Sequence, residues 1–315
     1  MKKRVGILSG GSGSSKFALG LTRLVESRGE QEEYDLGFVA NVGDNFWHLG
    51  QYVCPDIDIL TYALAGWLDE TKGWGISSDT SAAAGTHSTY YDAGSGWFNL
   101  GDRDLALSLR RTVLLQRGWK LSSITNAQSA ALGVKYAIIP STDSDVQTYV
   151  ASCLGYVHLQ EFWVKNHGSL PVKSILYLGI EQAEPNAEAQ KYLREGTVLI
   201  FPANPVTSIL PTVRIHGVAE WLASSRVTAI SPFVGDAPFS GPAGVMMRAL
   251  GVPTTSYGVA RLYLGFLKLM VVDSEEDRQI ISQVRDEGVE CISMPTRISS
   301  REDQLKVAKG VLEIL

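Results

Sequence analysis

The sequence predicts an α/β fold with a mainly parallel sheet and helices on both of its faces. Two observations carry this prediction. Short apolar runs of strand length alternate along the chain with longer segments in which apolar residues recur at helical spacing. Glycine and other small residues stand where several strands give way to helices. The chain has 315 residues, shows no repeat and has no clear internal boundary, so we predict a single domain over residues 1–315.

The predicted strands are short apolar runs, and they lie at Arg4–Leu8, Leu36–Val39, Val134–Ile139, Val157–Val164, Ser174–Leu178, Val198–Phe201, Val227–Ser231, Leu269–Asp273 and Val289–Ser293. The predicted helices lie at Lys16–Ser27, after the expected N-caps Asp56 and Asp102, from Ser122 or Ser123 to Gly133, at Pro185–Glu195, up to Glu287, and at Arg301–Leu315. Residues 70–100 follow neither pattern, and we predict an irregular, lid-like excursion there.

Composition excludes several classes of protein. Hydrophobic residues make up 45% of the chain, which argues against disorder, and the net charge of −5 argues against a nucleic-acid-binding surface. The three cysteines are far apart and form no CxxC pair. The first apolar run is too short for a signal peptide, and no run is long enough to cross a membrane. We therefore expect a cytoplasmic protein.

The first candidate binding motif lies between the first predicted strand and helix. It is a loop of small residues that ends in a lysine: Ser9, Gly10, Gly11, Ser12, Gly13, Ser14, Ser15 and Lys16. Backbone N–H groups in such a loop can approach a phosphate closely. The loop matches neither the Walker A pattern nor the dinucleotide fingerprint. The alternative is a tight turn without a ligand.

Two acidic motifs follow. Asn41 and Asp44 stand after the second predicted strand, at the sheet edge where α/β proteins bind ligands. Asp56 and Asp58 stand at the start of a predicted helix, a pattern that suits a divalent cation or a general base. The alternatives are an Asx turn for the first motif and simple complementation of the helix dipole for the second.

Three further candidate binding motifs lie at the start of one predicted helix and directly after two predicted strands. Asp102 and Arg103 start a helix, where arginine can contact a phosphate, or can form a structural ion pair instead. Polar residues and prolines follow two buried strands and are either ligand contacts or parts of ordered loops: Asn204, Pro205, Thr207 and Ser208 after the first, and Asp236, Ser240 and Gly241 after the second.

Together these motifs resemble the 2-phospho-L-lactate transferase family, named CofD, or FbiA in actinobacteria. The matching pieces occur in family order from residue 5 to about residue 273: SGGSGSSKF, NVGDNFWHLG, VCPDIDILTYALAG, GWG, WFNLGDRDLA, PANPVTSI and the block SPFVG to SGPAG. The residues after about 275 match poorly, and we expect them to contribute only to the fold.

The resemblance implies a Rossmann-like, doubly wound fold and a step in coenzyme F-420 biosynthesis. Family members transfer a phosphorylated three-carbon acid from a guanosine-diphosphate-linked donor to the deazaflavin Fo, release GMP and use Mg²⁺. On this basis we expect catalytic roles for Asp44, Asp58 and Arg103, and metal binding by Asp56 and Asp58. We expect substrate contacts from Gly10 to Lys16, from Asn41 and Asp102, and from the two loops at 204–208 and 236–241. From chain size alone we expect a homodimer.

Departures from the family pattern leave the donor acid open among phospholactate, phosphoenolpyruvate and 3-phosphoglycerate. These departures are Leu107, Ser108, Ala203 and Ser141. Two other functions are alternatives. One is a non-catalytic, nucleotide-sugar-binding regulatory protein of a related family that shares the opening glycine loop. The other is an NAD-dependent oxidoreductase, which the failed dinucleotide fingerprint disfavours.

Overall fold

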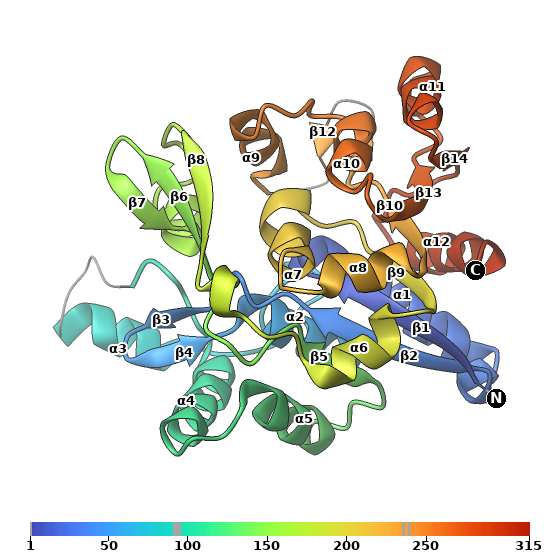
Figure 1. Ribbon diagram of the computed structural model, residues 1–315. Helices are drawn as coiled ribbons and strands as arrows, with labels where there is room; N and C mark the ends of the chain where they lie inside the picture. Colours follow the sequence, from blue (N-terminus) through green and yellow to red (C-terminus); the bar gives the residue numbers. More distant parts are fainter. Residues whose placement is uncertain (1, 91–95, 235–236, 239–240) are drawn as a thin grey trace.

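A parallel sheet of seven strands forms the centre of the protein in the computed structural model, which describes residues 2–90, 96–234, 237–238 and 241–315 (Figure 1). Its order is β14-β13-β10-β9-β1-β2-β5. The bounds are β1 Lys3–Ser9, β2 Tyr34–Ala40, β5 Ala137–Pro140, β9 Thr197–Ile200, β10 Arg226–Ile230, β13 Leu267–Val272 and β14 Glu290–Ser293. From β1 the chain continues to β2 and β5 on one side, whereas β9 and the later strands lie on the other. This reversal places a topological switch point between β1 and β9.

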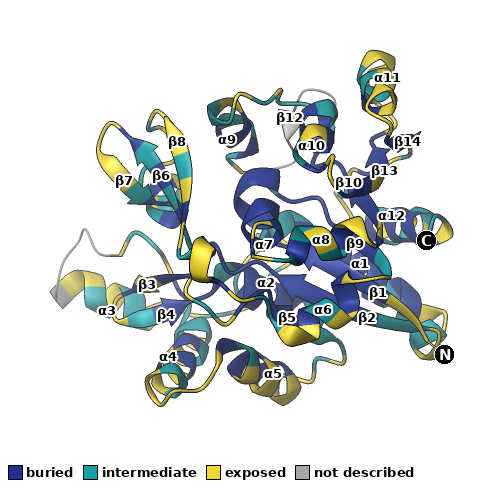
Figure 2. Cartoon of the chain, in the orientation of Figure 1, coloured by how far each residue is buried: buried dark blue, intermediate teal, exposed yellow. Residues whose placement is uncertain are grey.

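Helices cover both faces of the sheet. Helix α1 (Gly11–Ser27) packs against α2 (Pro55–Leu64) and α12 (Arg301–Glu313), and α6 (Ala187–Leu193) and α8 (Val218–Ala223) lie on the opposite face (Figure 1). The central strands are dark blue in Figure 2, which marks buried residues. Helices cover both faces of the sheet, and this is why these strands are continuous apolar runs in the sequence. The predicted Rossmann-like, doubly wound α/β fold is therefore confirmed.

Smaller elements surround this centre. Strands β3 (Phe46–His48) and β4 (Gln51–Val53) form a hairpin, and β6 (Gln147–Ser152), β7 (Gly155–His158) and β8 (Ser174–Leu178) form a separate antiparallel sheet. The remaining helices and strands are α3 Ala82–Tyr90, α4 Asp102–Gln116, α5 Leu121–Ala131, α7 Leu210–Val213, α9 Ala243–Ala249, α10 Ser256–Leu262, α11 Arg278–Asp286, β11 Phe233–Val234 and β12 Ala237–Pro238. Short 3-10 turns lie at Glu30–Glu32 and Ile180–Gln182, and π-helical turns at Glu161–Lys165 and Pro205–Ile209.

Several predicted boundaries are wrong. The strand predicted over 157–164 ends at His158, where pairing with β6 stops, and a π-helical turn follows. Helix α1 begins at Gly11, so most of the predicted glycine loop forms its first turns. Asp56 and Asp102 lie inside the first turns of α2 and α4, because Cys54 and Gly101 are the N-caps. Part of the stretch predicted as irregular forms α3, and its residues 91–95 lie outside the described residues.

Two glycines allow helix α6 to approach the sheet. A Cβ added to Gly6 on β1 would lie 2.2 Å from the carbonyl oxygen of Tyr192, and one added to Gly37 on β2 would lie 2.5 Å from the Tyr192 ring. Tyr192 is itself buried, and its hydroxyl donates to Asp35 at 2.9 Å. The sheet therefore has no room for side chains at these two positions.

Among the residues that the structure describes, none of the helices combines the length and the hydrophobicity that a bilayer crossing needs.

We expect Gly6→Ala to lower the free energy of unfolding by about 1–3 kcal/mol, because the backbone of α6 must move away from the new methyl group. Urea unfolding of the two proteins measures this difference. Gly85→Ala on α3 is the matched control, since an added Cβ there meets nothing within 4 Å. Equal stability of Gly6→Ala and the wild type would contradict the packing described above.

Candidate functional site

Asn41 lies directly after β2 and connects the two acidic motifs. Its amide nitrogen Nδ2 lies 3.0 Å from Asp44 Oδ1, 2.8 Å from Asp56 Oδ2 and 3.1 Å from the carbonyl oxygen of Thr207. Its side-chain oxygen accepts from the N–H of Gly43 at 2.9 Å, which fixes the orientation of the amide. The carboxyl ends of β2 and β9 and the start of α2 therefore meet at this one side chain.

The Asn41 amide cannot satisfy all of its acceptors fully. An amide nitrogen carries two hydrogens, whereas three oxygens lie within hydrogen-bonding distance of it. Two of these oxygens belong to carboxylates, and both carboxylates are buried. The donors of the protein therefore compensate the two carboxylates only in part.

Asp56 also reaches the start of helix α1. Its Oδ1 accepts from the N–H of Gly11 at 2.7 Å, so it occupies the position at which an anion would meet the first turn of the helix. Gly10 is required at this contact, because an added Cβ would lie 2.6 Å from the Cβ of Ser208 and 2.8 Å from Asp56 Oδ2. The glycine that the sequence assigns to phosphate binding thus first makes room for the protein's own carboxylate.

Asp44 is held on its other side by Gln160, whose Nε2 donates to Asp44 Oδ2 at 3.0 Å. Burial, followed by repulsion from Asp56, raises the pKa of Asp44 well above its usual range, although hydrogen bonds from Asn41 and Gln160 act in the opposite direction. Burial raises the pKa of Asp56 to about 6. The two carboxylates therefore ionise reluctantly unless positive charge is brought to them.

Two adjoining cavities, each of about 220 Å³, lie beside the first turns of α1. Both are lined by Lys16, Gly73 and Ile298. Ser12 and Gly13, which follow β1, and Pro202, which follows β9, line one of them and place it at the switch point of the sheet. We call these two cavities the switch-point groove.

The C-terminal segment contributes to this groove, contrary to our expectation that residues after 275 serve only the fold. Thr296, Ser299, Ser300 and Arg301 line the groove opposite Lys16. These residues follow β14, which adds to the far edge of the sheet, and α12 then packs against α1. No local sequence pattern indicates this contact, because it depends on tertiary packing.

The remaining residues of the predicted glycine loop and of the 204–208 loop differ in what their side chains contact. The hydroxyls of Ser14 and Ser15 contact the backbone of the same segment, at Gly10 and Ser12. Asn204 accepts from the N–H groups of Val206 and Thr207, and its buried Nδ2 has no hydrogen-bond partner among the described residues. Thr207 and Ser208 of this loop are buried beside the acidic pair, and Pro205 starts the π-helical turn.

Asp58 does not face this site. Its two oxygens bind the guanidinium of Arg111 on α4, with one Nη1–Oδ2 distance of 3.0 Å, and both side chains are buried. The prediction that Asp58 contacts substrate or metal does not fit this geometry, because Arg111 already compensates its charge. Sequence reasoning overlooked Arg111, because the other buried residues of α4, Ser108 and Thr112, are polar and give no signal of a buried ion pair.

The helix start at Asp102 and Arg103 is also occupied. Asp79 accepts from the N–H groups of Arg103 and Asp104 at 3.0 and 3.3 Å, and Asp102 in turn accepts from Ala82 and Ala83 at the start of α3. A protein carboxylate therefore already takes these N–H groups, while the roles expected for the Arg103 side chain and for Asp102 stay predictions. Asp236 and Ser240 lie outside the described residues, and Gly241 is exposed before the short helix α9.

An aromatic cluster borders Asp44, and sequence reasoning missed it. Phe46 stacks on His158 with ring centroids 5.2 Å apart, and His48, Trp97 and Phe98 pack around Phe46. His158 lies two residues before Gln160, the partner of Asp44. The cluster therefore lies beside the acidic pair, on the side of Gln160.

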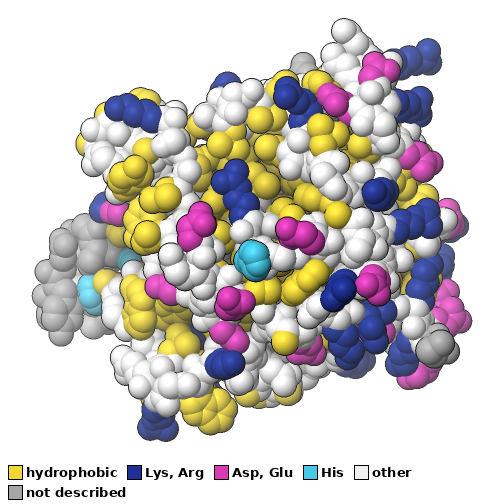
Figure 3. Space-filling view, viewed as in Figure 1, with side chains coloured by type: hydrophobic (Ala, Val, Ile, Leu, Met, Phe, Trp, Pro, Cys, Tyr) yellow, Lys and Arg dark blue, Asp and Glu magenta, His cyan; other side chains and the backbone are white. Residues whose placement is uncertain are grey.

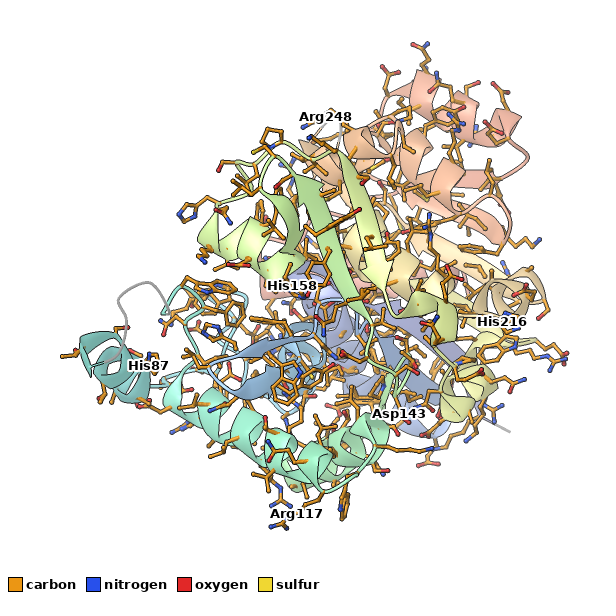
Figure 4. All side chains as sticks on the ribbon, turned by 60° about the vertical axis from the view of Figure 1, so that its left-hand side comes forward. His87, Arg117, Asp143, His158, His216 and Arg248 are labelled. Atoms are coloured by element: carbon orange, nitrogen blue, oxygen red, sulfur yellow. The ribbon has the colours of Figure 1, made fainter. Side chains whose placement is uncertain are left out.

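The histidines do not form a metal centre. His87, His158 and His216 lie in separate parts of the molecule in Figure 4, and burial lowers the pKa of His158 to about 4. Within the described ranges, His, Cys, Asp and Glu side chains form no group of three that could hold a metal. Any divalent cation at Asp44 and Asp56 would thus need oxygen ligands from a substrate or water, as Mg²⁺ usually has.

A family model described as 2-phospho-L-lactate transferase CofD matches residues 5–311. The chain belongs to this family. It is 33% identical over 279 residues to a 2-phospho-L-lactate transferase of Methanospirillum hungatei, covering 88% of this chain and 91% of that protein. It is 34% identical over 319 residues to a phosphoenolpyruvate transferase of Streptomyces coelicolor, covering 99% and 98%. Membership of the CofD family makes the protein a transferase.

A solved structure, protein BH3568 from Bacillus halodurans, shares the fold of this CofD-family chain. The TM-score is 0.66, the sequence identity is 16%, and the match covers 99% of this chain and all of that one, at 100%. At this identity the likeness concerns the fold alone.

The Asp56 pKa gives a pH-dependent prediction for the metal-free protein. Its pKa is about 6 when folded and near 3.9 when unfolded, so ionisation weakens the fold as pH rises from about 4 to above 6. Asp56→Asn removes this effect. We expect the stability of Asp56→Asn, minus that of the wild type, to increase by up to about 3 kcal/mol between pH 4 and pH 8.

Urea unfolding in the presence of a chelator at the two pH values measures this change. The substitution also alters hydrogen bonds, but their effect on stability is the same at both pH values. It therefore cancels when the stability difference at pH 4 is subtracted from the difference at pH 8. The exposed Asp286→Asn on α11 is the control and should change little between the two conditions. A stability difference between Asp56→Asn and the wild type that stays constant with pH would contradict the raised pKa of a buried Asp56 carboxylate.

Proposed function

We propose that this protein transfers a phosphorylated three-carbon acid from a guanosine-diphosphate-linked donor to the terminal ribityl hydroxyl of the deazaflavin Fo, releasing GMP, in coenzyme F-420 biosynthesis. The observation that carries this proposal is the acidic pair Asp44–Asp56, which contacts the start of α1 through Gly11 and is joined to His158 of the aromatic cluster through Gln160. The arrangement offers one side for a nucleotide donor, one side for a ring-containing acceptor, and acidic groups between them.

The donor side is supported by charge and by backbone geometry. Lys16 and Lys72 line the switch-point groove beside Ser12 and Gly13 in the first turn of α1. A diphosphate there would meet two cations and the positive end of a helix 17 residues long. Figure 3 shows basic side chains interspersed with acidic ones over the face in view, which fits a small phosphorylated ligand better than a nucleic acid.

The acceptor side is supported by the aromatic cluster. The partly exposed rings of Trp97 and Phe98, which pack on the buried Phe46, suit a planar heteroaromatic ligand, because offset and edge contacts between rings are favourable. Asp44 is tied to this side through Gln160, whereas Asp56 is tied to the donor side through Gly11. In the proposed reaction Asp44 therefore orients the acceptor hydroxyl.

The proposed step is a displacement at phosphorus. The hydroxyl oxygen of Fo forms a bond to the phosphorus that carries the acid, the bond from that phosphorus to the bridging oxygen breaks, and GMP leaves with the electron pair. Asp44 accepts the hydroxyl proton or passes it to water. Such transfers depend mainly on positioning and on neutralising charge, so the chain's main task is to align the two ligands.

Asp44 and Asp56 would hold Mg²⁺. They fit this ion because they are buried oxygen donors that share one amide, and because burial raises the pKa of both, so that added positive charge favours their ionised forms. When bound, Mg²⁺ supplies positive charge that offsets the charge developing on the diphosphate. We also propose a cytoplasmic location and a homodimer for the protein.

The decisive experiment offers the purified protein Fo and Mg²⁺ with each of three donors, carrying phospholactate, phosphoenolpyruvate or 3-phosphoglycerate. Mass spectrometry of the products identifies the acid that is transferred, and GMP is measured in the same mixture. We expect the wild type to form a product from one of the three donors. The turnover rates of Asp44→Asn and Asp56→Asn with that donor should be lower by about 100-fold or more, because each substitution removes a charge that the reaction uses.

Asp286→Asn serves again as the control and should keep full turnover. Nucleotide binding without turnover of any donor would defeat the transferase proposal and favour a regulatory nucleotide-binding protein. Full activity of Asp56→Asn would leave the transferase assignment intact but remove Asp56 from the site.

A further inference from the structure

Arg111 is one of the most completely buried side chains of the described chain, with 1% of its surface exposed. It lies on α4 and binds Asp58 through both ends of its guanidinium, while Nη1 also donates to the carbonyl oxygen of Tyr52 at 3.1 Å. Tyr52 belongs to β4 and Asp58 to α2. One guanidinium thus joins the end of a hairpin to the helix that follows it, across the turn between them.

The clamped turn presents Asp56 to the site. The N–H of Asp58 donates to the carbonyl oxygen of Cys54 at 2.9 Å, and Asp58 Oδ2 accepts from the N–H of Cys54 at 3.4 Å. Asp56 lies between these two residues and directs its carboxylate to Gly11 and Asn41. Movement of Asp58 would therefore turn the segment that carries Asp56.

Stability alone does not account for such a pair. Desolvation of two buried charges offsets much of their attraction, and well-packed apolar side chains often replace a buried ion pair without loss. What an apolar pair would lose is directionality, because only a planar guanidinium holds two carboxylate oxygens and a carbonyl in fixed directions. The geometry of this pair is thus better suited to orienting the turn than to stabilising the fold.

We propose that Arg111 is a positioning residue that acts through Asp58 to hold Asp56 in the geometry needed for a divalent cation. This inference rests on the proposed function, in which Asp44 and Asp56 hold the metal. Three other buried groups face the pair from α2 and α4 or adjoin the turn, namely Tyr62, Asp104 and Cys54, and the first two bind each other at 2.6 Å. The hydrogen-bond partners of Asp44 and Asp56 in the described part of the chain are Gly11, Asn41 and Gln160, and Tyr62, Asp104 and Cys54 are not among them.

The test measures Mn²⁺ binding to the full-length protein without substrates, by electron paramagnetic resonance of the free ion. Arg111→Lys keeps the charge but cannot span both carboxylate oxygens. We expect its Mn²⁺ affinity to fall by about 10-fold or more, as is typical when an outer partner of a metal ligand is lost. Tyr62→Phe is the matched control, because it alters a buried polar contact between the same helices, and it should bind Mn²⁺ as the wild type does.

A second variant separates positioning from folding. Asp58→Leu combined with Arg111→Met removes both charges and keeps the interior apolar. We expect this double variant to fold, as judged by urea unfolding, and yet to bind Mn²⁺ as weakly as Arg111→Lys. Wild-type affinity in either folded variant overturns the inference, and so does failure of both variants to fold, because the pair would then serve folding.

The wild type and Asp56→Asn distinguish this inference from the proposed function. Binding by the wild type that Asp56→Asn abolishes supports the metal site whatever Arg111→Lys does. If the wild type itself binds no Mn²⁺, the proposed metal site fails, and the role of Arg111 fails with it.

Discussion

The site depends on the amide of one side chain, Asn41, which lies between two buried carboxylates. Its two hydrogens are shared among Asp44, Asp56 and the carbonyl oxygen of Thr207, so neither carboxylate is fully compensated. Burial raises the pKa values of both acids, and the shared amide opposes that rise only in part, so the pair is suited to a cation. The glycines at positions 10 and 43 have a related purpose, because a Cβ at either would meet neighbours under 3.0 Å away.

The motifs that mark the family divide into residues that face the site and residues that hold them in place. In the Pro-Asp-Ile-Asp segment, Asp56 faces Asn41, whereas Asp58 is turned to Arg111. In the Gly-Asp-Arg-Asp segment, Asp102 caps α3 while Asp79 caps α4, so each helix start is closed by a carboxylate from the other's neighbourhood. Acidic residues in a motif therefore need not contact the substrate, even when their spacing suits it.

The sequence predicts the fold class well, because buried parallel strands such as β1 and β9 are continuous apolar runs bounded by small residues. It also indicates Asn41, Asp44 and Asp56, since the ends of parallel strands meet at one edge of the sheet. It does not indicate Gln160, Arg111 or Thr296, because these reach the site or its supports from elements whose placement depends on tertiary packing. It does not indicate that Asp58 turns to Arg111, because spacing on a helix start does not determine the direction of a side chain.

The most direct test of this account is a crystal of the protein grown with Mn²⁺ and examined for anomalous scattering at the manganese edge. We predict one strong peak bonded to an oxygen of Asp44 and an oxygen of Asp56, with Asn41 displaced from at least one of them. A peak at Asp58 or Asp102 with none between Asp44 and Asp56 would contradict the central claim that the shared amide marks a cation site.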